Sequence, residues 1–412
     1  MSSTTKLTDM GWGGESYRYT SLTEPLLTSE LIRLSSAKSI ETLMPSLFNP
    51  ASIRTLLARI ATPFKTGPFQ TVSGHAGHAT VDHVLRTLPN QIRTNLQNTP
   101  SRDPDHISNL LVDSVVAFDH SIEQDFLRLV PDLQTITQMS DDQLRAIVHD
   151  IESSPEKNAT ISNACTVVLP LLPSSIPLDT ISGLPASAIV KLDNSGKWST
   201  SLLSSFHNGR NRAEVERIHQ EHPDESECVY NSRVLGAIAV TRGQPPPLSF
   251  RSLASSQPVI ALGDFEFKLP AVFTDRILAR TNPGFKFSAT TLPAVLARIL
   301  TPPYLSSRPD VQHVSLADRD QYQDIRLIMC SDGLLDLYLD ASESLTLEQL
   351  PSIWLDVLDN RDTSSDAYNN NLALALLRHA IGGNDLEKVS RNITVKLGFR
   401  WMDDTTILVQ RI

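Results

Sequence analysis

Apolar side chains recur every three or four positions in several stretches of the chain, and this spacing predicts amphipathic helices. We expect such helices at residues 80–96, 110–129, 141–151 and 372–381, and a more charged helix at residues 212–221. Pro89 lies inside the first stretch and is expected to break or kink that helix at Leu88. Gly382 and Gly383 follow the last stretch, as is typical of a helix end.

Shorter apolar runs rich in β-branched residues predict strands. They lie at residues 166–172, 234–241, 327–330 and 405–409. Short helices are expected within residues 26–34 and 52–60, and the remainder of residues 1–30 is polar and expected to be irregular. Strands and helices are interspersed without a strict strand–helix–strand rhythm or an internal repeat. The pattern therefore favours an α+β domain over a doubly wound parallel sheet.

Composition narrows the function classes. The 412 residues are 40% hydrophobic and 20% charged, with a formal net charge of −10 and no Lys/Arg cluster, which argues against nucleic-acid binding. The three cysteines form no CxxC pair, so neither a disulfide framework nor a thiolate zinc site is expected. No apolar run reaches the ~20 residues of a membrane helix. The first thirty residues resemble neither a signal peptide nor an Arg-rich transit peptide, so we expect a soluble, intracellular protein.

Carboxylates stand at the ends of two predicted strands. Asp332-Gly333 follows the apolar run at 327–330, and Asp403-Asp404 precedes the run at 405–409. Carboxylates on strand ends can converge on a hard divalent cation, which prefers oxygen ligands. Taken singly, each motif has a plainer interpretation, because Asp-Gly is a common turn and an acidic pair is a common solvated cap.

A glycine-punctuated histidine motif precedes the helix expected at 80–96. Gly74-His75 begins a Gly-His-Ala-Gly sequence, where a histidine at a backbone kink could act as a general acid or bind metal. One alternative is a zinc cluster of His75, His78, Asp82 and His83, as in metallo-β-lactamase-type hydrolases, although its spacing departs from that pattern. Another alternative is a simple helix-capping turn.

Two further segments have ordinary structural interpretations. Residues 214–223 contain Glu-Val-Glu-Arg and end in His222-Pro223, as a charged surface helix would. Residues 261–268 contain a Gly-Asp turn at Asp264, followed by alternating aromatic and charged residues, as in a hairpin. The chain contains no Gly-x-Ser-x-Gly elbow, P-loop or dinucleotide glycine pattern.

Taken in order, these motifs resemble the metal-dependent protein serine/threonine phosphatases of the PP2C type, and in particular the pyruvate dehydrogenase phosphatase-like branch. The resemblance rests on the motifs at residues 74–77, 214–217, 222–223, 240–242, 261–264, 331–334 and 403–404. Thr-Pro-Pro-Tyr-Leu at 301–305 and His-Ala-Ile-Gly-Gly at 379–383 add to the likeness with that branch. The resemblance spans residues 67–412, which leaves residues 1–66 as an N-terminal extension.

The resemblance implies a four-layer α+β sandwich, in which two antiparallel sheets are flanked by helices. It also implies a centre of two Mg²⁺ or Mn²⁺ ions, a phosphoprotein substrate and a mitochondrial location. The carboxylates of Asp332 and Asp403 and the carbonyl of Gly74 match metal ligands, and His75 matches the general acid. Asp404 is the neighbour of a ligand, and Asp264 matches a structural Gly-Asp turn. No oligomeric state is implied.

Several positions depart from the family pattern. Ser73 stands where the family has an aspartate that bridges both metals, and a neutral hydroxyl cannot supply two ligand oxygens and a negative charge. An early Glu-Asp pair and a phosphate-binding arginine could not be placed. Residues 243–260 form an insertion whose three prolines, 245–247, exclude a central strand. These departures leave a second hypothesis open, a catalytically impaired pseudophosphatase that binds phosphoproteins as a scaffold.

Overall fold

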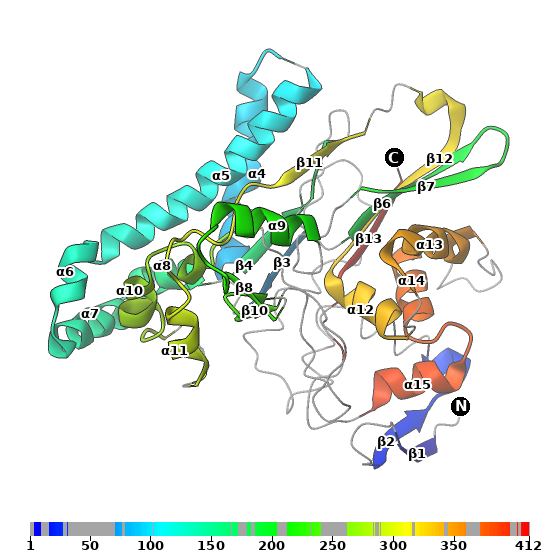
Figure 1. Ribbon diagram of the computed structural model, residues 1–412. Coiled ribbons are helices and arrows are strands. Elements are labelled where there is room, and N and C mark those ends of the chain that lie inside the picture. Colours follow the sequence, from blue (N-terminus) through cyan, green and yellow to red (C-terminus); the bar gives the residue numbers. More distant parts are fainter. Residues whose placement is uncertain are drawn as a thin grey trace.

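The computed structural model describes part of the chain. For Asp332 and for the strand at residues 71–75, it describes the backbone but not the side chains. The described residues are 4–9, 16–27, 31, 71–75, 79–101, 103–165, 167–171, 179–182, 186–203, 212–231, 233–239, 262–282, 284, 288, 290–314, 318–341, 345–359, 371–395, 402 and 405–411. Figure 1 shows long helices on one side of the molecule and a four-stranded sheet with its own covering helices on the other.

The four-stranded sheet is antiparallel, with the order β13-β12-β6-β7. Its strands are β6 (Ala186–Asp193), β7 (Trp198–Leu202), β12 (Tyr322–Cys330) and β13 (Ile407–Arg411). The strands predicted at 327–330 and 405–409 are confirmed as parts of β12 and β13. Strand β12 lies in the interior of the sheet, where it pairs with β6 on one side and β13 on the other.

Two antiparallel ladders form the second β-layer. Strand β3 (Thr71–His75) pairs with β4 (Val167–Leu171), and β5 (Asp179–Ser182) pairs with β11 (Asp310–His313). Helix α4 packs against β3 and β4, and helix α5 packs against β5 and β11. The ladders lie between these helices and the four-stranded sheet (Figure 1). The prediction of an α+β fold with antiparallel sheets flanked by helices is therefore confirmed.

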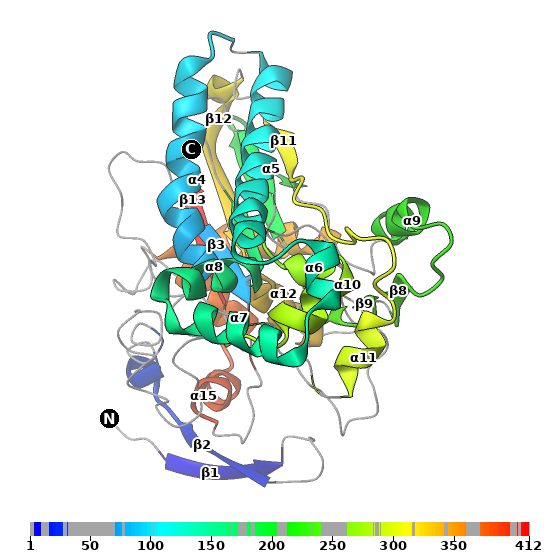
Figure 2. The same cartoon turned by 90° about the vertical axis from the view of Figure 1, so that its left-hand side faces the viewer.

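The outer helical layer follows the predicted periodicity. It contains α4 (Ala79–Asn98), α5 (Pro104–Leu129), α6 (Leu133–Gln138), α7 (Asp141–Ser153) and α8 (Pro155–Cys165), with α4 and α5 side by side in Figure 2. The expected break at Pro89 is wrong, because α4 continues through it to Asn98. The stripe that includes Val84 and Leu88 is buried against Leu111 and its neighbours on α5, and this packing outweighs the hydrogen bond that a proline removes.

Four helices cover the opposite face of the four-stranded sheet or pack beside it. They are α12 (Asp332–Ala341), α13 (Leu350–Asp359), α14 (Leu372–Ala380) and α15 (Leu386–Thr394). Trp354 of α13 is fully buried against Val190 and Ile328 of the sheet, among other apolar residues. The predicted helix at 372–381 is confirmed, and it ends at glycines with positive φ, 144° at Gly382 and 60° at Gly383.

The N-terminal residues correct one prediction. Within residues 1–30, expected to be irregular, β1 (Thr4–Asp9) and β2 (Ser16–Ser21) form an antiparallel hairpin. Helix α15 provides the partner that the local sequence does not reveal: the amide of Thr20 donates to Thr394 Oγ1 over 2.8 Å. Residues 24–27 are helical at the start of the helix expected within 26–34, whereas the one expected at 52–60 lies outside the described residues.

The single strand predicted at 234–241 is also wrong. Two-residue strands, β9 (Arg233–Val234) and β10 (Ile238–Ala239), form a tight hairpin there, next to β8 (Val229–Tyr230). The reversal takes place at Leu235 and Gly236, whose φ values are 53° and 69°. The apolar character of the segment therefore reflects burial of a turn: Leu235 is fully buried in a core that includes Val234 and Phe267.

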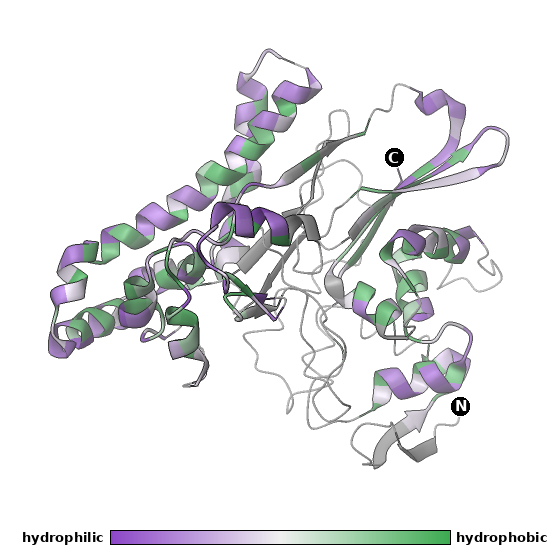
Figure 3. Ribbon diagram, in the orientation of Figure 1, coloured by the Kyte–Doolittle hydropathy of each residue, from purple (hydrophilic) through white to green (hydrophobic). Residues whose placement is uncertain are grey.

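The remaining helices are short, apart from the predicted α9 (Arg212–Glu221), which is confirmed and largely hydrophilic in Figure 3. They are η1 (Phe265–Phe267), α10 (Ala271–Phe273), the π-helical η2 (Thr274–Leu278), α11 (Thr291–Leu296), η3 (Arg319–Gln321) and η4 (Leu347–Gln349). The 3₁₀ turn η1 replaces the hairpin that alternating aromatic and charged residues suggested. Over the described part of the chain, every helix is too short or too polar to cross a membrane.

The glycine at the end of α14 offers a test of this packing. A Cβ at Gly382 would lie 2.9 Å from Val389 Cγ2 of α15. We expect Gly382→Ala to lower the free energy of unfolding by ~2–4 kcal/mol, through backbone strain and overpacking together. Gly196→Ala is the control, because its φ is also positive, at 84°, but a Cβ there meets nothing within 4 Å. Equal losses in chemical denaturation would contradict the role given to Val389.

Candidate active site

Ser331, which precedes Asp332, and Thr406, which follows Asp403 by three residues, lie at the same end of the four-stranded sheet. Cys330 of β12 and Ile407 of β13 are the last residue pair of the regular ladder. One position further, the amide of Ser331 donates to the carbonyl of Thr406 over 3.0 Å, and the amide of Thr406 donates to Ser331 Oγ over 2.9 Å. The residue before Asp332 and the segment after Asp403 are therefore joined.

The structure places the predicted ligands only in part. Asp332 is the first residue of α12, so Asp-Gly is a junction from strand to helix rather than a hairpin turn. Asp403 and Asp404 lie outside the described residues, as does the side chain of Asp332. Their roles as ligands stay predictions, and the described residues contain no group of three His, Cys, Asp or Glu side chains arranged to hold a metal.

Gly74 and His75 end strand β3, where they pair with Val168 and Val167 of β4. Helix α4 begins at Ala79, so the histidine lies at a junction from strand to helix, as its sequence suggested. The side chain of His75 is not among those described, and its role as a general acid stays a prediction. The same holds for the carbonyl of Gly74 as a ligand.

The alternative zinc cluster receives no support from the residues that are described. His83 lies against Phe118, with ring centroids 5.1 Å apart, and its pKa is lowered by burial and then by the nearby Arg86. Asp82, its neighbour in the chain, is exposed. His78 lies outside the described residues. The ligands that the sequence analysis predicted, the carboxylates of Asp332 and Asp403 and the carbonyl of Gly74, are instead all oxygens, a set that fits a hard cation such as Mg²⁺ or Mn²⁺.

A buried ionic group that the sequence analysis missed lies between α5 and η1. Asp119, in the middle of α5, accepts the amide of Gly263 over 2.8 Å and the ammonium of Lys268 over 2.7 Å. The side chains of Asp119 and Lys268 are each only 7% exposed, so removing either partner would leave a buried charge. This ion pair holds the Gly-Asp segment against the helical layer.

Asp264 and Glu266 form a carboxyl pair beside that ion pair. Both are buried, and Asp264 Oδ1 and both carboxyl oxygens of Glu266 have no hydrogen-bond partner among the described residues. Burial raises the pKa of Asp264 to about 7 despite the opposing charge of Lys268, and burial and then Asp264 raise that of Glu266. Two neighbouring carboxylates that are both buried are costly to ionise together, so the pair holds a proton near neutral pH.

His222 shows that the segment at 214–223 is more than a surface helix. It follows α9, is buried, stacks on Tyr304 at 4.3 Å between ring centroids, and its Nδ1 lies 2.8 Å from Thr301 Oγ1. The buried carboxylate of Glu225 accepts the hydroxyls of both Thr301 and Tyr304. Two motifs far apart in the sequence, His222-Pro223 and residues 301–305, are thus joined in one polar cluster.

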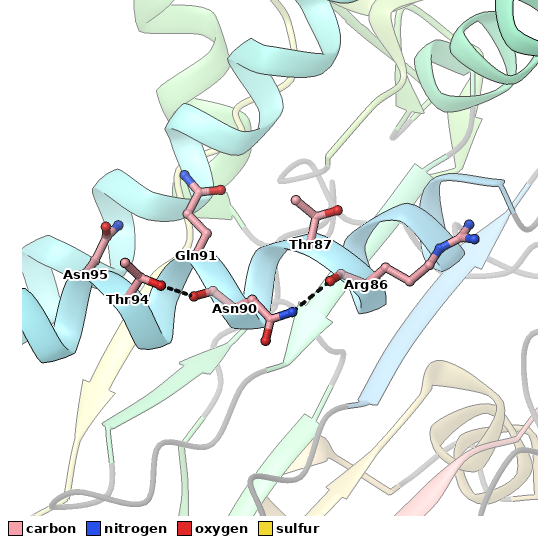
Figure 4. Close-up of a pocket in the computed structure, with 6 residues that line it drawn as sticks. All are labelled: Arg86, Thr87, Asn90, Gln91, Thr94 and Asn95. Carbon is pink, nitrogen blue, oxygen red and sulfur yellow. Dashed lines mark hydrogen bonds between the residues drawn. The ribbon is translucent and has the colours of Figure 1, made fainter.

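A shallow cavity of about 400 Å³ lies along helix α4 (Figure 4). It is lined by Arg86, Thr87, Asn90, Gln91, Thr94 and Asn95. Two of these side chains form hydrogen bonds with the backbone of the same helix. Asn90 donates to the carbonyl of Arg86 over 3.2 Å, and Thr94 donates to the carbonyl of Asn90 over 2.9 Å. The lining contains no carboxylate, imidazole or thiol, so it lacks the groups for metal binding or acid–base catalysis.

Comparison with known proteins finds similarity to one family of phosphatases. Residues 187–343 match the family model of protein phosphatase 2C. The chain is 26% identical over 296 residues to a protein phosphatase 2C homologue of Schizosaccharomyces pombe, covering 64% of this chain and 58% of that protein. It is 26% identical over 299 residues to the mitochondrial [pyruvate dehydrogenase [acetyl-transferring]]-phosphatase 1 of Saccharomyces cerevisiae, covering 70% and 44%. The chain thus spans about half the length of the curated relatives it matches.

These matches support the protein phosphatase 2C family, and the chain is similar to the pyruvate dehydrogenase phosphatases among the matched proteins. Among solved structures, the serine-threonine phosphatase 2C of Toxoplasma gondii is 13% identical, with a TM-score of 0.36 and 84% of each chain covered. That score is too low to define a shared fold, so the assignment depends on the sequence matches.

The proton held by Asp264 and Glu266 predicts how stability varies with pH. Because the folded-state pKa lies above the unfolded value, the pair's contribution is complete below about pH 4 and is lost as the pH rises through 7. A tenfold change in an acid dissociation constant corresponds to about 1.4 kcal/mol, so the loss reaches up to ~4 kcal/mol by pH 8. Glu266→Gln removes one of the two like charges, so we expect it to unfold at higher temperature than the wild type at pH 8 but not at pH 5.

The control for this experiment is Glu152→Gln, because Glu152 is an exposed carboxylate on α7. Its thermal unfolding should follow the wild type between pH 5 and pH 8. A Glu266→Gln profile parallel to that of the wild type would show that the pair does not share a proton.

Proposed function

We propose that this chain is a metal-dependent protein phosphatase that hydrolyses phosphoserine and phosphothreonine. The observation that carries the proposal is the pairing of Ser331, the residue before Asp332, with Thr406, three residues after Asp403, at one end of the sheet. The match of residues 187–343 to the family model of protein phosphatase 2C supports the same proposal. The comparisons give no support to the scaffold hypothesis, which becomes the contrary outcome of the experiments below.

The proposed roles of the residues follow from their chemistry. The carboxylates of Asp332 and Asp403 and the carbonyl of Gly74 would hold Mg²⁺ or Mn²⁺ through oxygen atoms. Such an ion lowers the pKa of bound water and so supplies a nucleophile at neutral pH. His75 would donate a proton to the serine or threonine oxygen that leaves the phosphorus, because an alkoxide is too basic to depart unprotonated. Residues 67–412 would form the phosphatase domain, with 243–260 as an insertion.

The substrate and location are proposed from the relatives. Several matched proteins are named as mitochondrial pyruvate dehydrogenase phosphatases, including those of Saccharomyces cerevisiae and Bos taurus. Phosphorylated pyruvate dehydrogenase, in mitochondria, is therefore the substrate to test first. This chain spans only part of each relative's length, so the substrate and location of those relatives are proposed for it and are to be tested on this chain itself.

The first test removes a proposed ligand. We expect Asp332→Asn to abolish Mn²⁺-dependent hydrolysis of p-nitrophenyl phosphate and of phosphoserine peptides, because an amide supplies neither the charge nor the second oxygen. Asp356→Asn, on the exposed side of α13, is the control and should keep wild-type turnover. Hydrolysis that survives in Asp332→Asn, or in the wild type with excess chelator, would contradict the proposal.

The second test restores the carboxylate that the family pattern contains. Ser73 lies in β3 opposite Leu169 and directly before Gly74. We expect Ser73→Asp to bind Mn²⁺ more tightly and to raise kcat, because a bridging carboxylate would add charge between two cations. Ser73→Asn, similar in size but neutral, should do neither. No turnover in the wild type and no gain in Ser73→Asp would instead favour the pseudophosphatase.

A further inference from the structure

At Ser331 the chain changes from strand β12 to helix α12. The carbonyl oxygen of Ser331 accepts the amide of Leu334, over 3.3 Å, in the first turn of the helix. In a regular antiparallel ladder that carbonyl would accept an amide from the neighbouring strand instead. The start of the helix therefore diverts one ladder hydrogen bond away from the segment that leads into β13.

The hydroxyl of Ser331 takes the place of this carbonyl. The amide of Thr406 donates to Ser331 Oγ over 2.9 Å, while the amide of Ser331 donates to the Thr406 carbonyl over 3.0 Å. The two residues thus exchange two hydrogen bonds, as a ladder pair does, but one of them runs through a side chain. Ser331 is only 1% exposed, so water has little access to replace that bond.

We propose that Ser331 is a positioning residue of the metal site, an inference that rests on the proposed phosphatase function. Asp332 follows Ser331 directly, and Asp403 precedes Thr406 by three residues. Since consecutive Cα atoms lie 3.8 Å apart, the Cα of Asp403 stays within about 11 Å of that of Thr406. The side-chain hydrogen bond of Ser331 therefore holds Thr406, in the segment that follows Asp403, against the residue that precedes Asp332.

A second buried serine provides a matched control. Ser390 of α15 is fully buried, and its Oγ accepts the amide of Leu22 over 3.0 Å. Like Ser331, it accepts a backbone amide from a segment far away in the sequence. It differs in position, because it holds Leu22 against α15, whereas Ser331 holds Thr406 at the end of the four-stranded sheet. Both alanine variants lose one buried side-chain acceptor, but only one loses it at the proposed metal site.

The experiment compares the full-length wild type with Ser331→Ala, Ser331→Thr and Ser390→Ala. For each protein, Mn²⁺ binding is measured by calorimetry, thermal unfolding by circular dichroism, and turnover with p-nitrophenyl phosphate. We expect both alanine variants to unfold at lower temperature, but only Ser331→Ala to bind Mn²⁺ about tenfold more weakly, the effect typical of losing a residue that orients a ligand. Ser331→Thr keeps the hydroxyl and should keep wild-type affinity.

Each outcome decides the proposal. If Ser331→Ala binds Mn²⁺ as tightly as the wild type, or no more weakly than Ser390→Ala, the positioning role is wrong while the phosphatase function stands. If the wild type neither binds Mn²⁺ nor hydrolyses the ester, the proposed function fails and the positioning role fails with it. If Ser331→Ala does not fold, Ser331→Cys replaces it, because the cysteine sulfur is similar in size to the hydroxyl but a weak acceptor. If Ser331→Cys then binds Mn²⁺ as tightly as Ser331→Thr, the proposal is overturned.

Discussion

The register between β12 and β13 is the constraint on which the rest of the structure depends. Successive residues of β12 pack into different cores: Leu327 and Met329 belong to one apolar cluster, and Ile328 and Cys330 to another. A slip of one residue would exchange the two faces, which burial on both sides strongly opposes. Packing of the apolar residues of β12 thus decides which residues lie at the end of that strand. The metal binding proposed there therefore depends on core residues that take no part in it.

Local pattern was enough to predict the elements that bury one regular stripe or run. The helices predicted at 110–129 and 212–221 and the strand predicted at 327–330 are of this kind, and they lie within α5, α9 and β12. The same reasoning failed where tertiary contacts override local preference. Ser16–Ser21 is a strand that pairs with β1 and contacts α15, and burial of Leu235 made a tight turn look like part of a continuous strand.

In the candidate site, too, local motifs could be predicted from the sequence, whereas contacts between distant residues could not. The motifs around Asp332 and Gly74 could be identified from residue types and order, and the structure places both at strand ends. The ion pair of Asp119 and Lys268 could not be predicted, because its partners are 149 positions apart and each alone looks like an ordinary surface charge. Ser331 was part of a recognised motif, but its role depends on Thr406, and no local pattern joins those residues.

The pairing of sequence-distant segments also sets the order in which the molecule can be completed during translation. Strand β13 is synthesised after α12, α13, α14 and α15, although it pairs with β12, which precedes them all. The N-terminal hairpin must likewise wait for α15 to leave the ribosome before β2 can dock. The helical layer of α4, α5 and α8 has no such requirement among its own contacts and can form early. The nascent chain would therefore carry β12 with one unpaired edge until β13 emerges, and this interval is when a chaperone would have most to protect.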